Sequence, residues 1–373
     1  MTKILFMIHD LGQGGAEKVL VNLVNNMDRS KFDISVITLF GGGVNEQFLK
    51  NDIHYKSIFK RTIPGNSKLM KIFTPRFLHK WFVKEKYDIE ISYLEGPSAR
   101  IISGCPSAET KLVSWIHVEQ HNMKKLAASF RNGGEAKACY NRFHQTVCVS
   151  EFVKDDFTSI LKFEKPICVL YNTADSEQIL LQSVEEQYEI SKKDRINLVA
   201  VGTLKESKGY MRLLRIIDRL VKESYNIHLY ILGIGPLESE MKKYIEENTL
   251  SNYITLLGYQ TNPYKYVSAC DLLVCASFAE GFSTAVTEAL ILGVPVCTVN
   301  VSGMKELLGV NNEFGVVTNN DEQSLYQGIK DFLDKKHFLE MYEDKARERG
   351  RVFSKENTVK AVENMLLSLS DGD

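Results

Sequence analysis

The chain has 373 residues, of which 44% are hydrophobic and 25% are charged, an ordinary globular composition at a length sufficient for two domains. No window approaches the roughly 18 uninterrupted apolar residues of a membrane-spanning helix, and the first residues lack the layout of a signal peptide. Seven cysteines are scattered without a Cys-x-x-Cys pair, which favours reduced, buried thiols in a cytoplasmic protein over disulfides or zinc.

Charge is distributed unevenly along the chain, although the net charge is only −1. Residues 1–142 hold 21 lysines and arginines against 13 acidic residues, a net charge of +8. The remaining residues hold 25 basic against 34 acidic side chains, a net charge of −9. Such asymmetry predicts that the N-terminal part of the protein meets an anionic surface.

The basic excess is densest over residues 56–86, which hold nine basic side chains, one acidic side chain and many apolar ones. A basic helix with aromatic residues on its other face is typical of an interfacial membrane anchor, and we predict membrane contact through this segment. The alternative is a helix that packs Phe77, Trp81 and Phe82 on a sheet and keeps its lysines in water. No recognition motif accompanies the charge, so nucleic acid is not an expected partner.

In chain order, an apolar strand at residues 3–8 leads into a loop with Gly12, Gly14 and Gly15, and then into a helical spacing of apolar residues over 16–27. A glycine-rich loop lets backbone approach a phosphate closely, but these glycines do not fit the dinucleotide-binding spacing, and a tight turn is the alternative. Further strands are predicted at residues 33–39, 88–93, 111–116 and 145–149. Alternating strands and helices predict a parallel sheet covered on both faces.

A second series of strands and helices follows a polar connection at residues 176–195. Strands with their following turns are predicted at residues 196–202, 230–236 and 254–259, and helices at 210–223 and within 321–370. In sheets of this kind ligands bind at the carboxyl ends of the strands. His117 directly follows such an end and is a candidate catalytic residue, although a lone histidine there is often structural.

The most informative stretch is residues 271–299, which predicts a buried strand, a loop with Glu280, a helix that begins at Ser283 or Thr284, and a second strand. The free N–H groups at such a helix start favour an anion. Glu288 lies about two helical turns beyond Glu280. Carboxylates placed here can accept hydrogen bonds from vicinal hydroxyls of a sugar or ribose. The alternative is that Glu280 caps the loop and Glu288 is a solvated helix residue.

Three strings in this stretch carry a family resemblance: Glu280-Gly281-Phe282-Ser283, Glu288-Ala289-Leu290 and Gly293-Val294-Pro295-Val296. Together they resemble the signature of glycosyltransferase family 4, which comprises retaining, nucleotide-sugar-dependent enzymes of GT-B architecture. The resemblance implies an α/β fold with two facing Rossmann-like domains and a cleft between them. It places an acceptor-binding domain at residues 1–170, a nucleotide-sugar-binding domain at 171–353, and a C-terminal helix at 354–373 that packs back on the first domain.

The resemblance also assigns roles within the 271–299 stretch. It implies that Glu280 lies against the donor sugar and that Glu288 holds the nucleotide ribose. The backbone amides between them, from Gly281, Phe282, Ser283 and Thr284, would cradle the donor diphosphate.

Matches elsewhere extend this site. The string Gly14-Gly15-Ala16-Glu17 resembles the family's loop towards the donor phosphates, and His117 occupies the place of a histidine that contacts the donor sugar. The string from Gly202 to Gly209 resembles a motif whose Arg and Lys bind the diphosphate; Lys208 matches the Lys, but Thr203 stands where the family has Arg.

Two more matches are the turn at Gly233 and the strand and loop that end at Tyr259. The loop at Tyr259 would hold the nucleobase through backbone atoms.

The implied function is retaining transfer of a hexosyl or N-acetylhexosaminyl group from a nucleotide sugar, UDP-linked by preference. The acceptor would be a glycan carried on a polyprenyl diphosphate, at the inner face of the membrane, in surface polysaccharide assembly. No metal or other cofactor is expected, because the pair of His117 and His121 lacks a third ligand in register. The alternative is an inactive, sugar-nucleotide-binding partner subunit, for which Thr203 is the best evidence.

Overall fold

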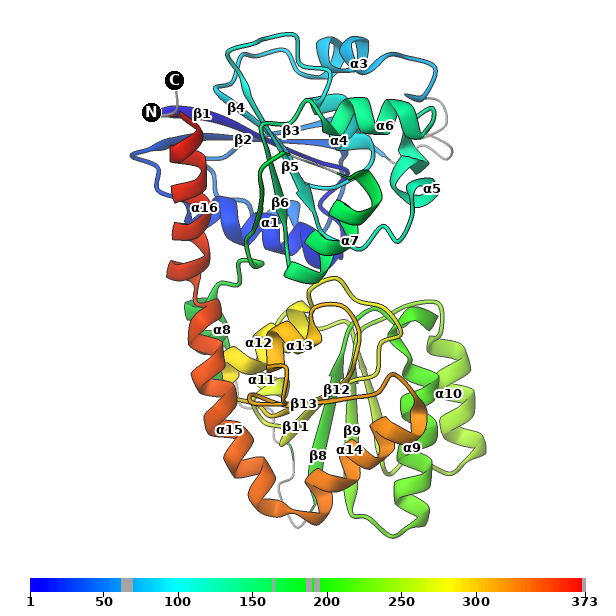
Figure 1. The fold of residues 1–373 in the computed structure, drawn as a ribbon. Coiled ribbons are helices and arrows are strands. Elements are labelled where there is room, and N and C mark those ends of the chain that lie inside the picture. Colours follow the sequence, from blue (N-terminus) through cyan, green and yellow to red (C-terminus); the bar gives the residue numbers. More distant parts are fainter. Residues whose placement is uncertain (62–69, 163–164, 186–189, 191–194, 371–373) are drawn as a thin grey trace. The chain divides into compact units, whose positions relative to one another are not determined.

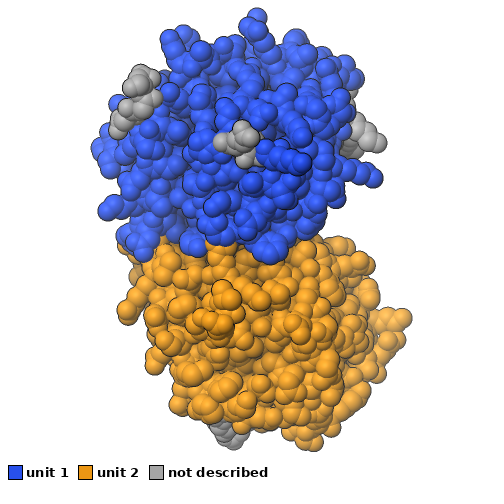
Figure 2. All heavy atoms as spheres, viewed as in Figure 1, with its two compact units in different colours: residues 1–173, 355–373 blue, residues 174–354 orange. Residues whose placement is uncertain are grey.

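The computed structural model divides the chain into two compact units, which are coloured separately in Figure 2. Unit 1 comprises Met1–Thr173 and Lys355–Asp373, and unit 2 comprises Ala174–Ser354. The structure describes residues 1–61, 70–162, 165–185, 190 and 195–370. Among these residues, no helix combines the length and the apolar character needed to cross a membrane.

Unit 1 contains a parallel sheet in the order β3-β2-β1-β4-β5-β6-β7 (Figure 1). Its strands are β1 (Thr2–Ile8), β2 (Phe32–Phe40), β3 (His54–Phe59), β4 (Ile89–Ser92), β5 (Lys111–Ile116), β6 (Gln145–Cys148) and β7 (Ile167–Val169). The chain winds outward from β1 to β3 and then resumes on the other side of β1. The order therefore reverses between β1 and β4, the position at which doubly wound sheets bind ligands.

Helices accompany this sheet. They are α1 (Gly15–Asn26), α3 (Pro75–Phe82), α4 (Pro97–Ile102), α5 (Met123–Leu126), α6 (Gly133–Tyr140), α7 (Glu151–Leu161) and α16 (Lys355–Ser370). The last helix returns from the far end of the sequence to pack beside α1 (Figure 1). Its Glu363 carboxylate accepts a hydrogen bond of 2.6 Å from the Asp28 backbone N–H.

Unit 2 contains a parallel sheet in the order β10-β9-β8-β11-β12-β13. Its strands are β8 (Ile196–Val201), β9 (Ile227–Leu232), β10 (Ile254–Gly258), β11 (Leu272–Cys275), β12 (Val296–Val299) and β13 (Val316–Thr318). Its helices are α8 (Ser176–Val184), α9 (Tyr210–Lys222), α10 (Glu238–Glu247), α11 (Tyr264–Val267), α12 (Thr284–Leu292), α13 (Met304–Leu308), α14 (Glu322–Asp334) and α15 (Lys336–Gly350).

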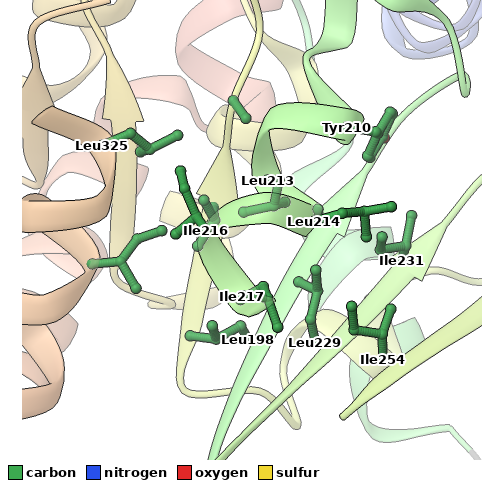
Figure 3. Close-up of a cluster of buried hydrophobic side chains, with 14 of the residues drawn as sticks. Leu198, Tyr210, Leu213, Leu214, Ile216, Ile217, Leu229, Ile231, Ile254 and Leu325 are labelled. Atoms are coloured by element: carbon green, nitrogen blue, oxygen red, sulfur yellow. The ribbon is translucent and has the colours of Figure 1, made fainter. Parts of the chain in front are cut away.

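The core of unit 2 joins α9 to the sheet. Leu213 and Ile217 on α9 lie among Leu198 of β8 and Leu229 of β9, and Leu325 of α14 belongs to the same cluster (Figure 3). Apolar residues on α9 recur at helical spacing, so one face is buried while the polar residues remain outside. This packing fixes the start of α9, which carries part of the site described below.

The prediction of two Rossmann-like units is confirmed by these two parallel sheets. The prediction of one basic helix over residues 56–86 is wrong, because residues 54–59 form the edge strand β3 and the described helix is only Pro75–Phe82. Lys56 suits an edge strand, where an exposed lysine opposes further strand pairing. Lys68 and its neighbours at 62–69 lie outside the described residues.

Helix α3 is fixed to the sheet by a buried polar contact. His79 Nε2 lies 2.7 Å from Glu90 Oε2 on β4, and the Cys105 thiol lies 3.7 Å from the other oxygen of Glu90. Burial opposes a charge on the imidazole, but the contacts with Cys105 and Glu90 outweigh it and raise the pKa of His79 from 6.5 to about 9. The His79 imidazole is therefore protonated at neutral pH.

This ion pair predicts a pH-dependent contribution to stability. Because the pKa of His79 is raised on folding, its contribution is complete below pH 6.5 and is lost as pH rises through about 9. His79→Gln should cost on the order of 3 kcal/mol at pH 6, the scale for breaking a buried pair, and less at pH 10. Thermal melting of both proteins across this range measures the difference, with His54→Gln as a control because the His54 side chain is 71% exposed. A difference that stays constant with pH would contradict the assignment.

Candidate active site

The predicted donor-binding residues of unit 2 follow the carboxyl ends of adjacent strands. Gly202 and Thr203 follow β8, Gly233 follows β9, and Tyr259 follows β10. Backbone hydrogen bonds connect these turns: Gly202 N–H donates to Leu232 O at 3.0 Å, and Gly233 N–H donates to Gly258 O at 2.8 Å. The structure therefore brings these four predicted residues to one edge of the sheet.

Two glycines allow the loops at this edge to approach closely. A Cβ atom on Gly233, whose φ is +141°, would lie 2.0 Å from the carbonyl oxygen of Gly202. A Cβ atom on Gly209, whose φ is +68°, would lie 1.9 Å from the carbonyl oxygen of Ala276. Any other residue at either position would push the loops apart.

Lys208 and Glu280 form an ion pair at this edge. Lys208 ends a short 3-10 turn (Glu206–Lys208), and Glu280 lies in the loop between β11 and α12. Lys208 Nζ lies 2.6 Å from Glu280 Oε1, and Ser277 Oγ donates to the same oxygen at 2.6 Å. The two residues that the resemblance assigns to the diphosphate and the sugar are thus in direct contact.

A buried arginine, not foreseen from the sequence, supports the Glu280 loop. Arg212 on α9 donates to the carbonyl oxygens of Ala276 and Ser277, and its guanidinium lies 4.3 Å from the centre of the Phe278 ring. Arg212 is 3% exposed, and burial lowers the pKa of its guanidinium. A charge on the same helix face as the buried Ile216 was the signal that could have revealed it.

Helix α12 begins directly after this loop. Ser283 is the N-cap residue, because its hydroxyl accepts a hydrogen bond of 3.4 Å from the Val286 N–H, and Thr284 is the first helical residue. The side chain of Phe282 is buried against Phe353, so only its backbone can face a ligand. Gly281 precedes it in the same loop.

Glu288 is not a solvated helix residue, so that alternative is wrong. It is 9% exposed, and Tyr264 OH lies 3.5 Å from its Oε1 atom. Both carboxylates of the predicted site are thus held in a largely buried environment on unit 2.

Three further predicted residues belong to unit 1. Gly14 is the N-cap residue of α1 and Gly15 begins that helix. His117 follows β5; its ring lies 4.9 Å from Tyr93, and its backbone N–H donates to Glu95 at 3.0 Å. That these residues reach the donor stays a prediction.

The His117 imidazole is neutral at physiological pH. Burial lowers the pKa of His117 to about 3, against a hydrogen bond from its ring to the Tyr93 backbone. Its Nε2 atom is buried and has no hydrogen-bond partner among the described residues. An imidazole in this state can exchange a hydrogen bond with a ligand but cannot supply a positive charge.

Potential metal ligands gather elsewhere in unit 1. Within the described ranges, the side chains of Glu119, His121 and Asp156 form one group of three, and those of His79, Glu90 and Cys105 form another. His121 is therefore grouped with two carboxylates, whereas the His117 ring packs beside Tyr93.

Comparison with known proteins agrees with this geometry. The model of "Glycosyltransferase Family 4" matches residues 13–178, and the model of "Glycosyl transferases group 1" matches residues 183–349. The chain belongs to the family 4 glycosyltransferases. Its two Rossmann-like units are those of the GT-B fold.

Relatives of this glycosyltransferase include a Campylobacter jejuni protein named N-acetylgalactosamine-N,N'-diacetylbacillosaminyl-diphospho-undecaprenol 4-alpha-N-acetylgalactosaminyltransferase. The two are 29% identical, over 95% of this chain and 96% of the relative. Similar solved structures include Anabaena HepE with UDP and glucose, at a TM-score of 0.78 and 18% identity, over 99% of this chain and all of that one. A glycosyltransferase from Rickettsia africae has a TM-score of 0.79 at 16% identity, over 100% and 99% of the two chains.

The contacts of Arg212 generate a prediction about the Glu280 loop. Arg212→Met would leave the buried carbonyl oxygens of Ala276 and Ser277 unpaired, at a cost of about 1–3 kcal/mol each. Amide hydrogen exchange over residues 276–283 should then become at least about tenfold faster. Arg215→Met is the matched control, since Arg215 lies on the same helix with its side chain 48% exposed. Equal effects of the two substitutions would contradict a specific role for Arg212.

Proposed function

We propose that this glycosyltransferase moves a hexosyl or N-acetylhexosaminyl group from a UDP-sugar to a glycan acceptor on a polyprenyl diphosphate, with retention of anomeric configuration. The observation that carries the proposal is the ion pair between Lys208, in the loop after β8, and Glu280, in the loop between β11 and α12. The name of the Campylobacter jejuni relative includes a diphospho-undecaprenol acceptor, and HepE was crystallised with UDP, both of which support the substrates proposed.

The proposed chemistry needs stabilisation of the departing diphosphate. Lys208 and the backbone amides at Ser283 and Thr284, the start of α12, supply positive charge and N–H donors where negative charge develops. Glu280 orients the sugar, and Glu288 accepts hydrogen bonds from the ribose. The bond between the anomeric carbon and the phosphate oxygen breaks, the acceptor oxygen bonds to that carbon on the same face, and the acceptor proton passes to the departing phosphate.

A second candidate function is an inactive, donor-binding partner subunit. Thr203 is the observation that favours it, because an uncharged side chain stands where the family has an arginine for the diphosphate. One lysine remains a competent phosphate partner, so we place catalysis first.

Incubation with a panel of UDP-sugars and glycan-diphosphate lipid acceptors tests the function. Release of UDP with elongation of the acceptor indicates an enzyme, and binding without turnover indicates the partner subunit. NMR of the product linkage tests retention.

Metal dependence is tested in the same assay. Because the phosphate charge is met by Lys208 and backbone amides, we expect turnover to survive excess EDTA. Loss of turnover that magnesium or manganese restores would contradict this and direct attention to the group of Glu119, His121 and Asp156.

The role of Glu288 predicts the outcome of a binding experiment. If it holds ribose hydroxyls in its largely buried position, Glu288→Ala should weaken UDP binding about 10- to 100-fold, the scale of a charged hydrogen bond. Calorimetry with free UDP measures this, with the exposed Glu240→Ala on α10 as the control. Unchanged affinity in the Glu288 variant would end the ribose assignment. Glu280→Ala should instead reduce turnover, because its partner is the sugar.

A membrane surface is the proposed place of work, and an aromatic patch on unit 1 supports it. The patch consists of Ile72, Phe77 and Trp81, which are 67%, 49% and 50% exposed. Phe77 lies 5.7 Å from Trp81, ring centre to ring centre. Exposed cationic side chains lie on the same helix and directly after it: Arg76, Lys80 and Lys84. Apolar rings flanked by cations suit the interface of an anionic bilayer.

Two arginines hold the turn that begins the patch. Arg100, which is 1% exposed, donates to the carbonyl oxygens of Met70 and Phe73. Arg131 donates to the carbonyl oxygen of Ile72 at 2.7 Å. The exposed apolar residues therefore lie on a fixed backbone, which lowers the cost of ordering them on a partner.

Cosedimentation with liposomes that contain anionic lipid checks this proposal. Each lysine or arginine near the surface contributes about 1 kcal/mol, so changing Arg76, Lys80 and Lys84 to Glu should weaken binding about 100-fold or more at low salt. Lys242→Glu with Lys243→Glu, on the exposed face of α10, is the control for charge alone. Absence of wild-type binding at low salt would end the proposal. An equal loss of liposome binding in both variants would mean that the net charge of the protein, and not the patch, determines binding.

A further inference from the structure

Glu280 forms an ion pair with Lys208, the cation that we propose binds the donor phosphates. Lys208 Nζ and Ser277 Oγ each lie 2.6 Å from the same carboxylate oxygen, Glu280 Oε1. The side chains of Lys208 and Glu280 are 24% and 10% exposed, and Ser277 is 1% exposed. This pair is therefore far less hydrated than an ordinary surface ion pair, and separating it leaves a poorly solvated carboxylate.

The backbone holds both partners in place. The Phe278 N–H donates to the carbonyl oxygen of Ser207 at 2.8 Å, which joins the loop of Lys208 to the loop of Glu280. Gly209 lets the same two loops touch at Ala276, and Arg212 fixes the carbonyl oxygens that precede Phe278. The contact is thus a consequence of two fixed loops and not of two long side chains that meet in solvent.

We propose that Glu280 competes with the diphosphate for Lys208, so that the site binds the complete donor in preference to the nucleoside diphosphate product. This inference rests on the proposed function. A nucleoside diphosphate alone must draw Lys208 away from Glu280 and leave that carboxylate with the Ser277 hydroxyl. A complete donor brings sugar hydroxyls, which donate hydrogen bonds to Glu280 as Lys208 turns to the phosphates. The competition therefore weakens the hold on the product after the sugar has left.

If Lys208 instead contacts Glu280 and the phosphate at the same time, removal of the Glu280 charge has the opposite effect on the binding of the nucleoside diphosphate. An ammonium group has three N–H donors and can bridge a carboxylate and a phosphate at once. If Lys208 does so, Glu280 orients Lys208 for the phosphate, and removing the carboxylate charge weakens the binding of the nucleoside diphosphate. The sign of the effect of one substitution separates the two arrangements.

Calorimetry with UDP on the full-length protein is the test. Glu280→Gln keeps the volume and an acceptor for Ser277 but removes the charge that holds Lys208. We expect it to bind UDP about tenfold more tightly than the wild type, with a smaller gain or a loss for the UDP-sugar. Glu322→Gln, which removes an exposed ion-pair partner of Arg215, is the matched control and should change neither affinity.

Two further variants test the competition without relying on Glu280→Gln alone. Ser277→Ala should shift UDP affinity in the opposite direction, because Glu280 then depends more on Lys208. Glu280→Gln made together with Lys208→Met should bind UDP no more tightly than Lys208→Met alone. A tenfold gain that persists without Lys208 would overturn the competition.

The outcomes also separate the inference from the proposed function. Wild-type binding of UDP with unchanged or weaker binding by Glu280→Gln would overturn the inference and leave the proposed function intact. Absence of UDP binding by the wild type and by every variant would overturn both.

Discussion

The candidate site on unit 2 depends on a buried cation that is held by uncharged amide oxygens and not by a carboxylate. Within the described residues, Arg212 makes no salt bridge; its guanidinium bonds to carbonyl oxygens of the loop after β11 and to Asn320 at 3.0 Å. Amide oxygens carry partial negative charge, so a buried guanidinium is stabilised when several of them converge on it. The loop conformation and the position of the arginine therefore stabilise each other. This arrangement positions Glu280, which lies in the same loop, and so also the contact between Glu280 and Lys208.

Much of the fold follows from local patterns in the sequence. Apolar runs predict most of the strands that the structure contains, although not β3, β7 or β13. Parallel order follows for strands that are joined through a helix. The predicted site residues on unit 2 came from the family resemblance. They lie in the turns after strands or, like Glu288, in the helix that follows, and the carboxyl ends of parallel strands meet at one end of the sheet. Ser283 as N-cap is likewise local, since a hydroxyl at that place satisfies a free N–H of the helix.

Other features depend on contacts between distant parts of the chain, which local patterns do not contain. From the sequence alone, Arg212 is an ordinary polar residue of an amphipathic helix. Its partner Ala276 lies 64 residues later, so only the folded structure shows the contact. The basic segment overlaps β3, in which the backbone of Lys56 pairs with Ile37 of β2. Composition does not reveal this position at the edge of the sheet. Phe282 resembles a ligand-facing residue, yet its ring fills space beside Phe353, from the end of unit 2. In each case the deciding partner is remote in sequence.

The path of the chain through the two units has a consequence for biosynthesis. Unit 2 is contained within residues 174–354, whereas unit 1 needs α16, whose Glu363 bonds to the backbone at Asp28. As the chain emerges from the ribosome, the first 173 residues are made early but lack their last helix until nearly everything else has been synthesised. All seven strands of unit 1 precede unit 2 in the sequence, so only the packing of α16 on α1 has to follow the synthesis of unit 2. Until then, the face of α1 that packs beside α16 stays uncovered on the nascent chain.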